Sequence, residues 1–428
     1  MTPIQKESLP IILEGKDIIA QAKTGSGKTV AFGIGVLNRL NVKRFRIQTV
    51  ILCPTRELAN QVANEVRKLA RCMHNVKVLT LCGGMPYKPQ VNSLFHGAHI
   101  LVGTPGRVLK HLSEENMNFD DVNTLVLDEA DRMLDMGFNE DIQSIIKMMP
   151  KDRQSLLFSA TFPEDIDELS QSILNNPTKV SVISKETVKI EEHFYQVKDE
   201  NKTALLPALF STYAVKSVVI FCNTKIKCDS LFDELDELGF DVLVLHSDFD
   251  QKERDETLTL FANKSYPILI ATDVAARGLD IDDIDMVINY DVAKDAAVHT
   301  HRVGRTARAQ KSGRAVTFVN EYDLDNMDEI QENITYLNTE KLEDDLSFKL
   351  DAPYRTLYIN GGKKNKVRAG DILGSLIQEV GLQKDDVGKI NIFNFYTYVA
   401  VKKEVEQKAL KGLENGKIKG KRFKVYPR

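Results

Sequence analysis

Short apolar runs recur along most of this chain, and they do not alternate between polar and apolar residues. The first series occupies residues 17–21, 49–54, 76–81, 99–103, 124–127 and 155–159. Runs of this kind are typical of strands buried on both faces of a sheet. Amphipathic helical patterns such as 56–71 and 140–149 separate them. The rhythm therefore predicts an α/β domain with a parallel sheet and helices on both faces.

A polar stretch over residues 184–192 interrupts this rhythm, which then restarts. The second series occupies residues 194–197, 218–221, 242–245, 268–271, 286–289 and 315–319. We expect two tandem α/β domains, at residues 1–184 and 192–335, followed by an acidic tether at 336–353.

The pattern changes near residue 354. Strands are predicted at 356–360, 389–395, 396–402 and 422–426, and helices at 369–380 and 404–413. The resulting order βαββαβ is typical of a ferredoxin-like α+β sandwich, the layout of RNA-recognition modules. We predict a small RRM-like domain over residues 354–428.

The net charge of −4 is the sum of two unlike parts. Residues 354–428 hold 17 Lys and Arg against 7 Asp and Glu, whereas residues 321–352 hold 11 acids and two lysines. A basic module on an acidic body favours a nucleic-acid partner, and the alternative is a solvated charged face.

The composition excludes several classes of protein. With 428 residues and 43% hydrophobic content, the chain is typical of multidomain globular proteins. Its apolar runs are too short for a transmembrane helix, and its first residues do not form a signal peptide. These two features also predict no membrane partner. The five cysteines form no CxxC pair, so we expect buried thiols in a reducing cytoplasm.

A glycine-rich sequence, Ala22-Lys23-Thr24-Gly25-Ser26-Gly27-Lys28-Thr29, follows the first predicted strand and opens a helical pattern. Glycines let backbone N–H groups face a phosphate, and the helix N-terminus adds its dipole. Lys28 is expected to reach the β- and γ-phosphates, and Thr29 to ligate Mg²⁺. Ala22 departs from the pattern, which has glycine there. The alternative is an ordinary glycine-rich turn.

Carboxylates follow the predicted strand 124–127 directly, in the sequence Asp128-Glu129-Ala130-Asp131. The carboxyl end of a buried parallel strand is where ligands bind such sheets. Asp128 is expected to hold Mg²⁺, and Glu129 to position and deprotonate the attacking water. The alternative is an exposed acidic helix start. Together the two motifs predict an NTPase.

These residues resemble the DEAD-box ATP-dependent RNA helicases. Asp128–Asp131 matches the motif that names the family, and further motifs match in order: 54–58, 104–107, 159–161, 271–280 and 301–308. The resemblance implies two RecA-like domains that close around ATP and single-stranded RNA, and RNA-stimulated hydrolysis of ATP with Mg²⁺ that separates short RNA duplexes.

The resemblance also implies residue roles. Lys28, Asp128, Glu129, Arg305 and Arg308 are catalytic, the two arginines by neutralising charge on the γ-phosphoryl group. Other nucleotide contacts are Gln5, Ala22, Lys23, Thr24, Gly25, Ser26, Gly27, Thr29, Gly278 and Asp280. Asp131, Ser159, Thr161 and His301 couple the domains. A metal pair at His299 and His301 is the alternative, and it carries little weight.

RNA contacts implied by the resemblance go to phosphates and 2′-hydroxyls, which suits short loops of Gly, Thr and Arg. They are Arg56, Gly84, Thr104, Gly106 and Arg107 in the first domain, and Asn223, Thr224, Thr272 and Arg277 in the second. For Arg56 the alternative is an ion pair with Glu57 or another helix acid.

The first residues resemble the family's adenine-recognising motif, in which the Gln5 amide bonds the adenine edge. The family's upstream aromatic residue, which stacks on adenine, is not in this sequence. We therefore expect adenine selectivity with weakened ATP affinity.

Two basic loops flank the predicted strands of the last domain, and they predict RNA binding. The first holds Lys363, Lys364, Lys366 and Arg368, and the second spans 417–422. Tyr358, Tyr396 and Tyr398 fall on one face of the sheet, either as a platform for bases or as a partly buried aromatic cluster.

The segments 359–366, 388–390 and 397–401 resemble the C-terminal domain of DbpA-type bacterial helicases. That resemblance implies anchoring to a hairpin of large-subunit ribosomal RNA in pre-ribosomal particles, by a cytoplasmic monomer that acts in ribosome biogenesis. The alternative functions are a non-hydrolysing RNA-binding scaffold and a DNA translocase. Intact Lys28, Glu129, Arg305 and Arg308 argue against the first, and the RRM-like domain against the second.

Overall fold

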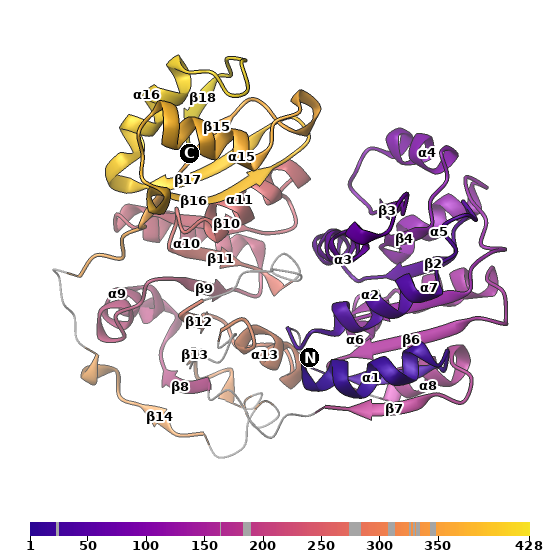
Figure 1. Ribbon diagram of the computed structural model, residues 1–428. Coiled ribbons are helices and arrows are strands. Elements are labelled where there is room, and N and C mark those ends of the chain that lie inside the picture. The colour runs from indigo at the N-terminus through magenta and orange to yellow at the C-terminus, as the bar shows by residue number, and fades with distance from the viewer. Residues whose placement is uncertain are drawn as a thin grey trace. The chain divides into compact units, whose positions relative to one another are not determined.

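The computed structural model describes residues 1–22, 25–162, 164–182, 190–273, 284–306, 313–324, 327, 330, 334–342 and 348–428. These residues form two compact units, one with the described residues up to 182 and one with those from 190 onward. Figure 1 labels their helices and strands.

The first unit is built on a seven-stranded sheet in the order β3-β4-β2-β5-β6-β1-β7, in which every pairing is parallel. The strands are β1 (Ile18–Gln21), β2 (Thr49–Leu52), β3 (Val78–Leu81), β4 (Ile100–Gly103), β5 (Thr124–Asp128), β6 (Gln154–Ser159) and β7 (Thr178–Ser181). Six of these were expected from the sequence. The edge strand β7 was missed because only one of its side chains, Val180, is buried.

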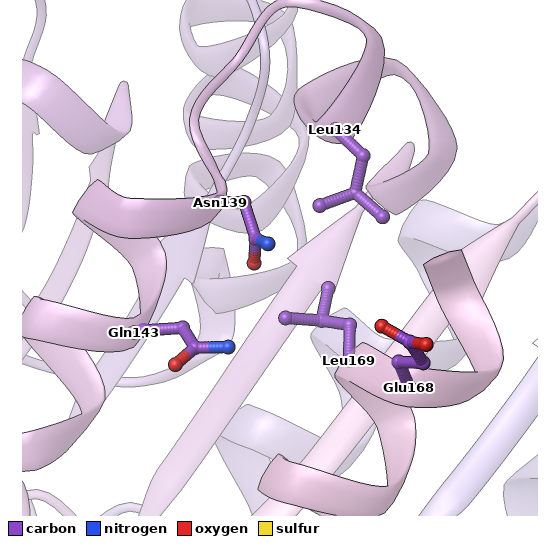
Figure 2. A pocket seen from close by; sticks show the side chains of 5 residues that line it. All are labelled: Leu134, Asn139, Gln143, Glu168 and Leu169. Carbon is purple, nitrogen blue, oxygen red and sulfur yellow. The ribbon is translucent and has the colours of Figure 1, made fainter. Parts of the chain in front are cut away.

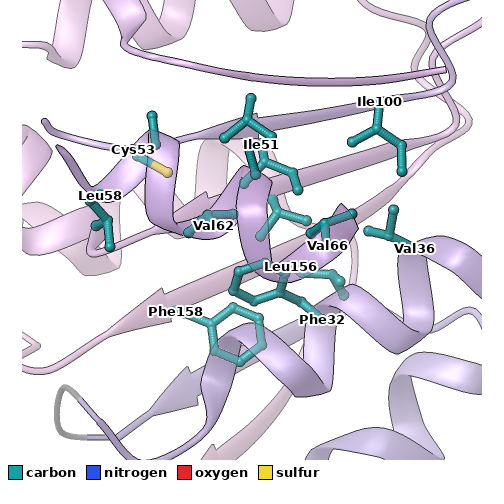
Figure 3. Close-up of a cluster of buried hydrophobic side chains, with 14 of the residues drawn as sticks. Phe32, Val36, Ile51, Cys53, Leu58, Val62, Val66, Ile100, Leu156 and Phe158 are labelled. Carbon is teal, nitrogen blue, oxygen red and sulfur yellow. The ribbon is translucent and has the colours of Figure 1, made fainter. Parts of the chain in front are cut away.

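Helices cover both faces of this sheet. They are α1 (Pro3–Leu13), α2 (Lys28–Arg39), α3 (Arg56–Leu69), α4 (Tyr87–Phe95), α5 (Pro105–Ser113), α6 (Ala130–Asp135), α7 (Asn139–Lys147) and α8 (Glu164–Ile173). One core joins the sheet to α1, α2 and α3 through side chains such as Phe32 and Val62 (Figure 3). The other joins it to α5, α7 and α8 through Val108, Ile142 and Leu169.

Alternate residues of each central strand enter opposite cores. In β2, Ile51 belongs to the core beneath α3, whereas Val50 and Leu52 belong to the core on the other face. All four residues of β2 are buried. This arrangement confirms the prediction of strands buried on both faces, and it accounts for their continuous apolar sequence.

The second unit begins with another seven-stranded sheet, in the order β10-β11-β9-β12-β13-β8-β14, again with parallel pairings. Its strands are β8 (Ile190–Gln196), β9 (Val218–Phe221), β10 (Val242–Leu245), β11 (Ile268–Ala271), β12 (Met286–Asn289), β13 (Gly313–Val319) and β14 (Tyr336–Leu337). Its helices include α9 (Lys202–Thr212), α10 (Lys225–Glu237), α11 (Gln251–Ala262) and α13 (Ala296–Val303).

The stretch expected to be a tether packs against this sheet. Its residues Tyr336 and Leu337 pair with β8 as strand β14. Further on, Leu350 is buried in the core of the second unit, with Phe348 packed against that core. The described residues of this stretch therefore hold the following module close to the second sheet.

The C-terminal module has a four-stranded antiparallel sheet in the order β16-β17-β15-β18. Its strands are β15 (Tyr354–Ile359), β16 (Val387–Ile392), β17 (Thr397–Lys402) and β18 (Val425–Pro427). Helix α15 (Ala369–Gly374) continues as a π-helical turn at Ser375–Glu379, and α16 is Glu406–Asn415. Both pack on one sheet face through Ile372, Leu376 and Leu413. The module thus confirms the predicted ferredoxin-like order.

Short 3₁₀ turns connect several elements, at Ala70–Cys72, Asp199–Asn201, Thr339–Lys341, Lys363–Asn365, Lys384–Asp386 and Lys403–Val405. Four of the five cysteines are buried as expected, but Cys72 is exposed, because it lies in the turn after α3. Among the residues described, no helix combines the length and apolar character needed to cross a membrane.

Candidate ATP site and RNA-binding surfaces

The phosphate loop lies between β1 and α2. The backbone N–H of Ala22 donates to the carbonyl of Ser159 on β6 at 3.0 Å, which fixes the start of the loop. Gly25 and Gly27 adopt φ angles of +82° and +93°, in the region that favours glycine. Lys23 and Thr24 lie outside the described residues. The loop leads into α2 at Lys28, as its sequence predicts.

Gln5 is tied to this loop. Its amide Nε2 donates to the carbonyl of Gly27 at 3.2 Å, and its Oε1 accepts from the backbone N–H of Thr2 at 3.0 Å. A Cβ on Gly27 would lie 2.5 Å from Gln5 Nε2. The side chain expected to recognise adenine therefore lies against the phosphate loop, where only glycine leaves it room.

Lys28 and Asp128 are both buried where β1 and β5 end. Lys28 Nζ donates to the carbonyl of Ala22 at 2.9 Å. Asp128 Oδ1 is buried and has no hydrogen-bond partner among the described residues. Burial raises the pKa of Asp128 to about 6, against the opposing effect of the Lys28 charge. Hard cations such as Mg²⁺ prefer oxygen ligands. The unsatisfied Asp128 oxygen and the hydroxyl of Thr29, which follows Lys28, fit such a cation.

Glu129 adopts an unusual backbone conformation, with φ +54°. Its side chain is buried, and its Oε2 accepts from Arg132 Nη1 at 3.0 Å. The pair is almost fully enclosed, with both side chains less than 10% exposed. Arg132 therefore orients the carboxylate that we expected to act on water, and it was not among the expected site residues.

Asp131 joins the β5 motif to the end of β6. Its Oδ2 accepts from Thr161 N at 2.9 Å, Thr161 Oγ1 at 2.8 Å and Ala160 N at 3.2 Å. Ser159 Oγ in turn donates to the carbonyl of Thr161 at 2.7 Å. The structure thus brings together three of the four residues expected to couple the domains.

Four of the expected RNA residues of the first unit lie close together, at the starts of α3 and α5 and in the loop after β3. The guanidinium of Arg56 lies directly against Gly84, where a Cβ would overlap it. The N–H of Gly83 donates to Thr104 Oγ1 at 3.4 Å. Arg107 Nη1 donates to the carbonyl of Met85 and to Gln90 Oε1, both at 3.1 Å. Gly106 is exposed in the first turn of α5.

Arg302 organises the expected site of the second unit. Its Nε and Nη2 donate to the two oxygens of Asp273 at 2.6 and 2.7 Å, and Nη2 also donates to Asn223 Oδ1 at 2.7 Å. The side chain is 1% exposed. One buried guanidinium therefore connects the motifs at 271–280 and 301–308 with Asn223.

The other expected residues of this unit lie after β9 and β11, near α13, or outside the described residues. Asn223 and Thr224 are exposed where β9 leads into α10, and Thr224 caps that helix by accepting from Lys227 N at 3.2 Å. The backbone N–H of Thr272 donates to the carbonyl of Leu245 at 3.3 Å. Arg305 is buried beside α13, which carries His301. Arg277, Gly278, Asp280 and Arg308 lie outside the described residues.

His299 pairs with a carboxylate. Its Nε2 lies 2.9 Å from Glu192 Oε2, and the ring is buried. The described residues contain no group of three or more His, Cys, Asp or Glu side chains that could hold a metal ion.

The tyrosines of the C-terminal module form a packed cluster. The rings of Tyr358 and Tyr398 have centroids 5.6 Å apart, and Tyr396 lies 5.5 Å from Tyr398. Tyr398 is fully buried, and burial and the charge of Glu256 on α11 raise its pKa. Burial, followed by the charges of Asp255 and Glu256, raises the pKa of Tyr396 to about 12. The three rings share one face, as predicted, and form an aromatic cluster in which Tyr398 is buried and Tyr358 and Tyr396 are partly buried.

Polar contacts fix this sheet to the second domain. Asn263 Nδ2 donates to Thr356 Oγ1 at 3.1 Å, and the hydroxyls of Ser265 and Thr356 lie 2.7 Å apart. Arg428 Nε lies 2.9 Å from Glu256 Oε1. The sheet face of the module is therefore an internal interface.

Three family models match successive parts of the chain. They describe a DEAD/DEAH box helicase at residues 2–169, a helicase conserved C-terminal domain at 201–310 and a DbpA RNA-binding domain at 356–427. A relative from Escherichia coli K12, the ATP-dependent RNA helicase DbpA, is 48% identical over 428 residues, covering 99% of this chain and 94% of the relative. The chain belongs to the DEAD-box ATP-dependent RNA helicases. Its domains and relatives place it in the DbpA type.

Two further comparisons agree with this membership. The Bacillus subtilis 168 helicase DbpA is 37% identical over 99% of this chain and 94% of the relative. Saccharomyces cerevisiae Dbp5 bound to RNA and ADP BeF3 matches this helicase with a TM-score of 0.71 and 30% identity, covering 79% of this chain and 90% of that one.

A separate hollow of about 420 Å³ lies in the first unit between α6, α7 and α8 (Figure 2). Leu134, Asn139, Gln143, Glu168 and Leu169 line it. None of these residues belongs to the phosphate loop or to Asp128–Asp131, so this hollow is distinct from the expected ATP site of the helicase.

Proposed function

We propose that this helicase separates or remodels short duplexes in large-subunit ribosomal RNA during ribosome assembly, held near its target by the C-terminal module. The observation that carries the proposal is the joining of two basic loops into one surface of that module. Lys419 Nζ donates to the carbonyl of Lys366 at 3.0 Å, and Asn360 N donates to the carbonyl of Lys424 at 2.9 Å. The first bond joins the 363–368 loop to the 417–422 loop, and the second joins the residues that flank them, so the two loops lie side by side.

This surface has the chemistry of a phosphate-binding site. Residues 359–370 and 416–428 contain no Asp or Glu. In the described part of the chain, no carboxylate pairs with Lys363, Lys364 or Lys366. Cations that lack internal partners remain available to neutralise phosphates, which makes binding salt-dependent. The proposal extends to a ribosomal RNA target in the cytoplasm, bound by a single copy of the chain within pre-ribosomal particles, which is what the resemblance of the module's sequence to the C-terminal domain of DbpA-type helicases implies.

ATP hydrolysis is assigned to the residues around the phosphate loop. Gln5 selects adenine, and Lys28 leaves the Ala22 carbonyl to hold the β- and γ-phosphates. Thr29 and Asp128 would hold Mg²⁺, which supplies charge neutralisation on the phosphates when bound. Glu129, oriented by Arg132, accepts a proton from the attacking water. Arg305 and Arg308 stabilise charge on the transferring phosphoryl group.

RNA contacts of the helicase core are assigned to the polar and glycine residues that the resemblance to the family implies. Arg56, Gly84, Thr104, Gly106 and Arg107 would hold the RNA backbone in the first unit. Asn223, Thr224, Thr272 and Arg277 would do so in the second. Backbone N–H groups and guanidinium groups bind phosphates without reading bases, so this part of the interaction is expected to be sequence-tolerant.

The experiment that tests hydrolysis compares Glu129→Gln with the exposed control Glu140→Gln. We expect Glu129→Gln to abolish steady-state ATPase while retaining RNA binding in the presence of ATP, because the amide cannot accept the proton. Glu140→Gln should retain both. Unchanged turnover in Glu129→Gln would overturn the assignment of Glu129.

A further inference from the structure

We propose that Phe395 is a base-stacking residue of the C-terminal module, and that Lys363 and Lys364 bind the phosphates that flank the stacked base. The ligand is a single-stranded nucleotide segment. This inference rests on the proposed anchoring of the module to RNA, and it names the part of the module that holds unpaired bases.

The sheet face leaves little aromatic surface for a base. Tyr398 is fully buried beside Glu256, and Tyr358, Phe393 and Tyr396 stack on one another around it. The interface with Asn263 and Ser265 of the second domain covers the same sheet. A base bound by this module therefore needs an aromatic ring elsewhere.

Phe395 supplies such a ring. It lies in the turn between β16 and β17 and is 64% exposed, whereas the neighbouring Phe393 and Tyr396 are partly buried. Within the described residues no other aromatic ring stacks on it. The only other large aromatic side chain exposed in the module is Tyr426, at 46%.

The turn that carries Phe395 is fastened to the first basic loop. Lys363 N donates to the carbonyl of Phe393 and Lys364 N to the carbonyl of Asn394, both at 2.9 Å. Thr397 Oγ1 donates to the carbonyl of Gly361 at 2.8 Å. These three bonds hold the aromatic turn and the two lysines together in one rigid element.

Gly362 makes this fastening possible. A Cβ at Gly362 would lie 2.7 Å from the backbone nitrogen of Tyr396 and would also overlap the carbonyl of Phe393. Only glycine lets the basic loop approach the turn this closely. The close approach is therefore encoded by the sequence.

An exposed aromatic ring beside fixed ammonium groups suits a single-stranded nucleotide. Base–aromatic stacking tolerates any base because every base has a π-face, and the lysines attract the adjoining phosphates. A duplex already stacks its bases internally and offers no free face along its length. We therefore infer that Phe395 favours unpaired nucleotides beside the anchored RNA.

The chain contains no tryptophan, which permits a site-specific test. Phe395→Trp makes the only tryptophan in the full-length helicase, and its emission reports only on this turn. Decauridylate (rU10) is the probe. We expect saturating quenching by rU10 and little change with a blunt ten-base-pair RNA duplex. Adding Lys363→Ala and Lys364→Ala should weaken the titration at least about 5-fold and reduce its log–log salt slope by about 1.4.

Tyr426→Trp is the matched control, because it places a sole tryptophan on the other exposed aromatic position of the module. Its emission should not respond to rU10. Quenching of Tyr426→Trp without quenching of Phe395→Trp would overturn the proposal in favour of the sheet. A response of Phe395→Trp to phosphatidylserine vesicles but not to rU10 would overturn it in favour of a membrane surface.

The affinity of labelled RNA distinguishes this inference from the proposed anchoring. Fluorescence anisotropy with a labelled large-subunit rRNA hairpin is measured for Phe395→Ala and for the double lysine variant. Weakened binding by both supports both claims. Weakened binding by the lysine variant alone overturns only the stacking role. Unchanged binding by both overturns the anchoring itself.

Discussion

The carboxylate of Asp131 accepts hydrogen bonds from both the backbone N–H and the hydroxyl of Thr161, at 2.9 and 2.8 Å. Three residues earlier, Asp128 has a buried oxygen with no partner among the described residues. Two acids of one short motif therefore have opposite environments. One stabilises the fold, and the other is held ready for a ligand.

This difference predicts opposite effects of two matched substitutions on the ligand-free protein. The pKa of Asp128 is raised from 3.8 to about 6, so the folded state binds this proton more tightly than the unfolded chain. Ionised Asp128 then lowers stability above about pH 6, by about 3 kcal/mol. Asp128→Asn should increase the free energy of unfolding at pH 8 by up to about that amount. The gain should vanish as the pH falls through about 4.

Asp131→Asn should lower the free energy of unfolding at pH 8 by about 1–3 kcal/mol. The NH₂ group of asparagine would then face the N–H and O–H donors that now bond to the carboxylate oxygen. Urea unfolding of the first unit at several pH values measures both effects. Equal signs for the two variants would contradict the environments described above.

Arg302 is expected to be essential for the stability of the second unit. Arg302→Met removes the buried guanidinium that binds Asn223 and partly buried Asp273, and should cost about 3–5 kcal/mol. Arg302→Lys should recover only part of this loss, because an ammonium cannot make the forked bonds. The exposed control Lys294→Met should change stability by less than about 1 kcal/mol. Thermal unfolding measures all three, and full recovery by lysine would contradict the role of the fork.

The Thr356 hydroxyl makes two of the polar contacts between the module and the second domain. Thr356→Val leaves Asn263 and Ser265 without a buried partner, which should cost about 1–3 kcal/mol. Hydrogen exchange should increase in β15 and at residues 263–265, whereas Thr300→Val on the exposed side of α13 should leave these segments protected. Equal protection in both variants would show that the module is not held by these bonds.

Gly362→Ala is expected to displace the first basic loop from the β16–β17 turn, because the added Cβ overlaps backbone atoms. The rRNA hairpin should bind more weakly, and the module should lose about 1–3 kcal/mol of stability. Gly370→Ala is the control, since nothing lies within 4 Å of its Cβ position. Anisotropy and thermal unfolding measure the two effects. Identical behaviour of the two alanine variants would contradict the close approach.

Much of this architecture could be predicted because its elements are buried. The strands β9 and β11 are apolar throughout, β2 is apolar except for Thr49, and every residue of the three strands is buried. The short edge strands β7 and β14 were missed because pairing there uses backbone groups, while most of their side chains face solvent or are partly exposed. Sequence periodicity carries little information about such strands.

The site was predictable in its motifs but not in its internal contacts. The phosphate loop and Asp128–Asp131 are contiguous in sequence, so spacing alone identified them. Arg302 lies within a recognised motif, yet nothing in the sequence shows that it turns inward toward Asp273. Likewise, alternation placed Tyr396 and Tyr398 on one face, but which element covers that face depends on the packing of α11. Side chains that act through tertiary contacts cannot be identified from local patterns.

ATP turnover in this helicase is expected to be coupled to an rRNA target through the C-terminal module. The steady-state ATPase rate of the full chain and of a chain ending at residue 353 tests this coupling. Each is measured without RNA, with bulk ribosomal RNA and with a large-subunit rRNA fragment carrying the hairpin. We predict strong stimulation of the full chain by the hairpin fragment, and equal, weaker stimulation of the shortened chain by either RNA. Equal stimulation of the full chain by any RNA would contradict this coupling.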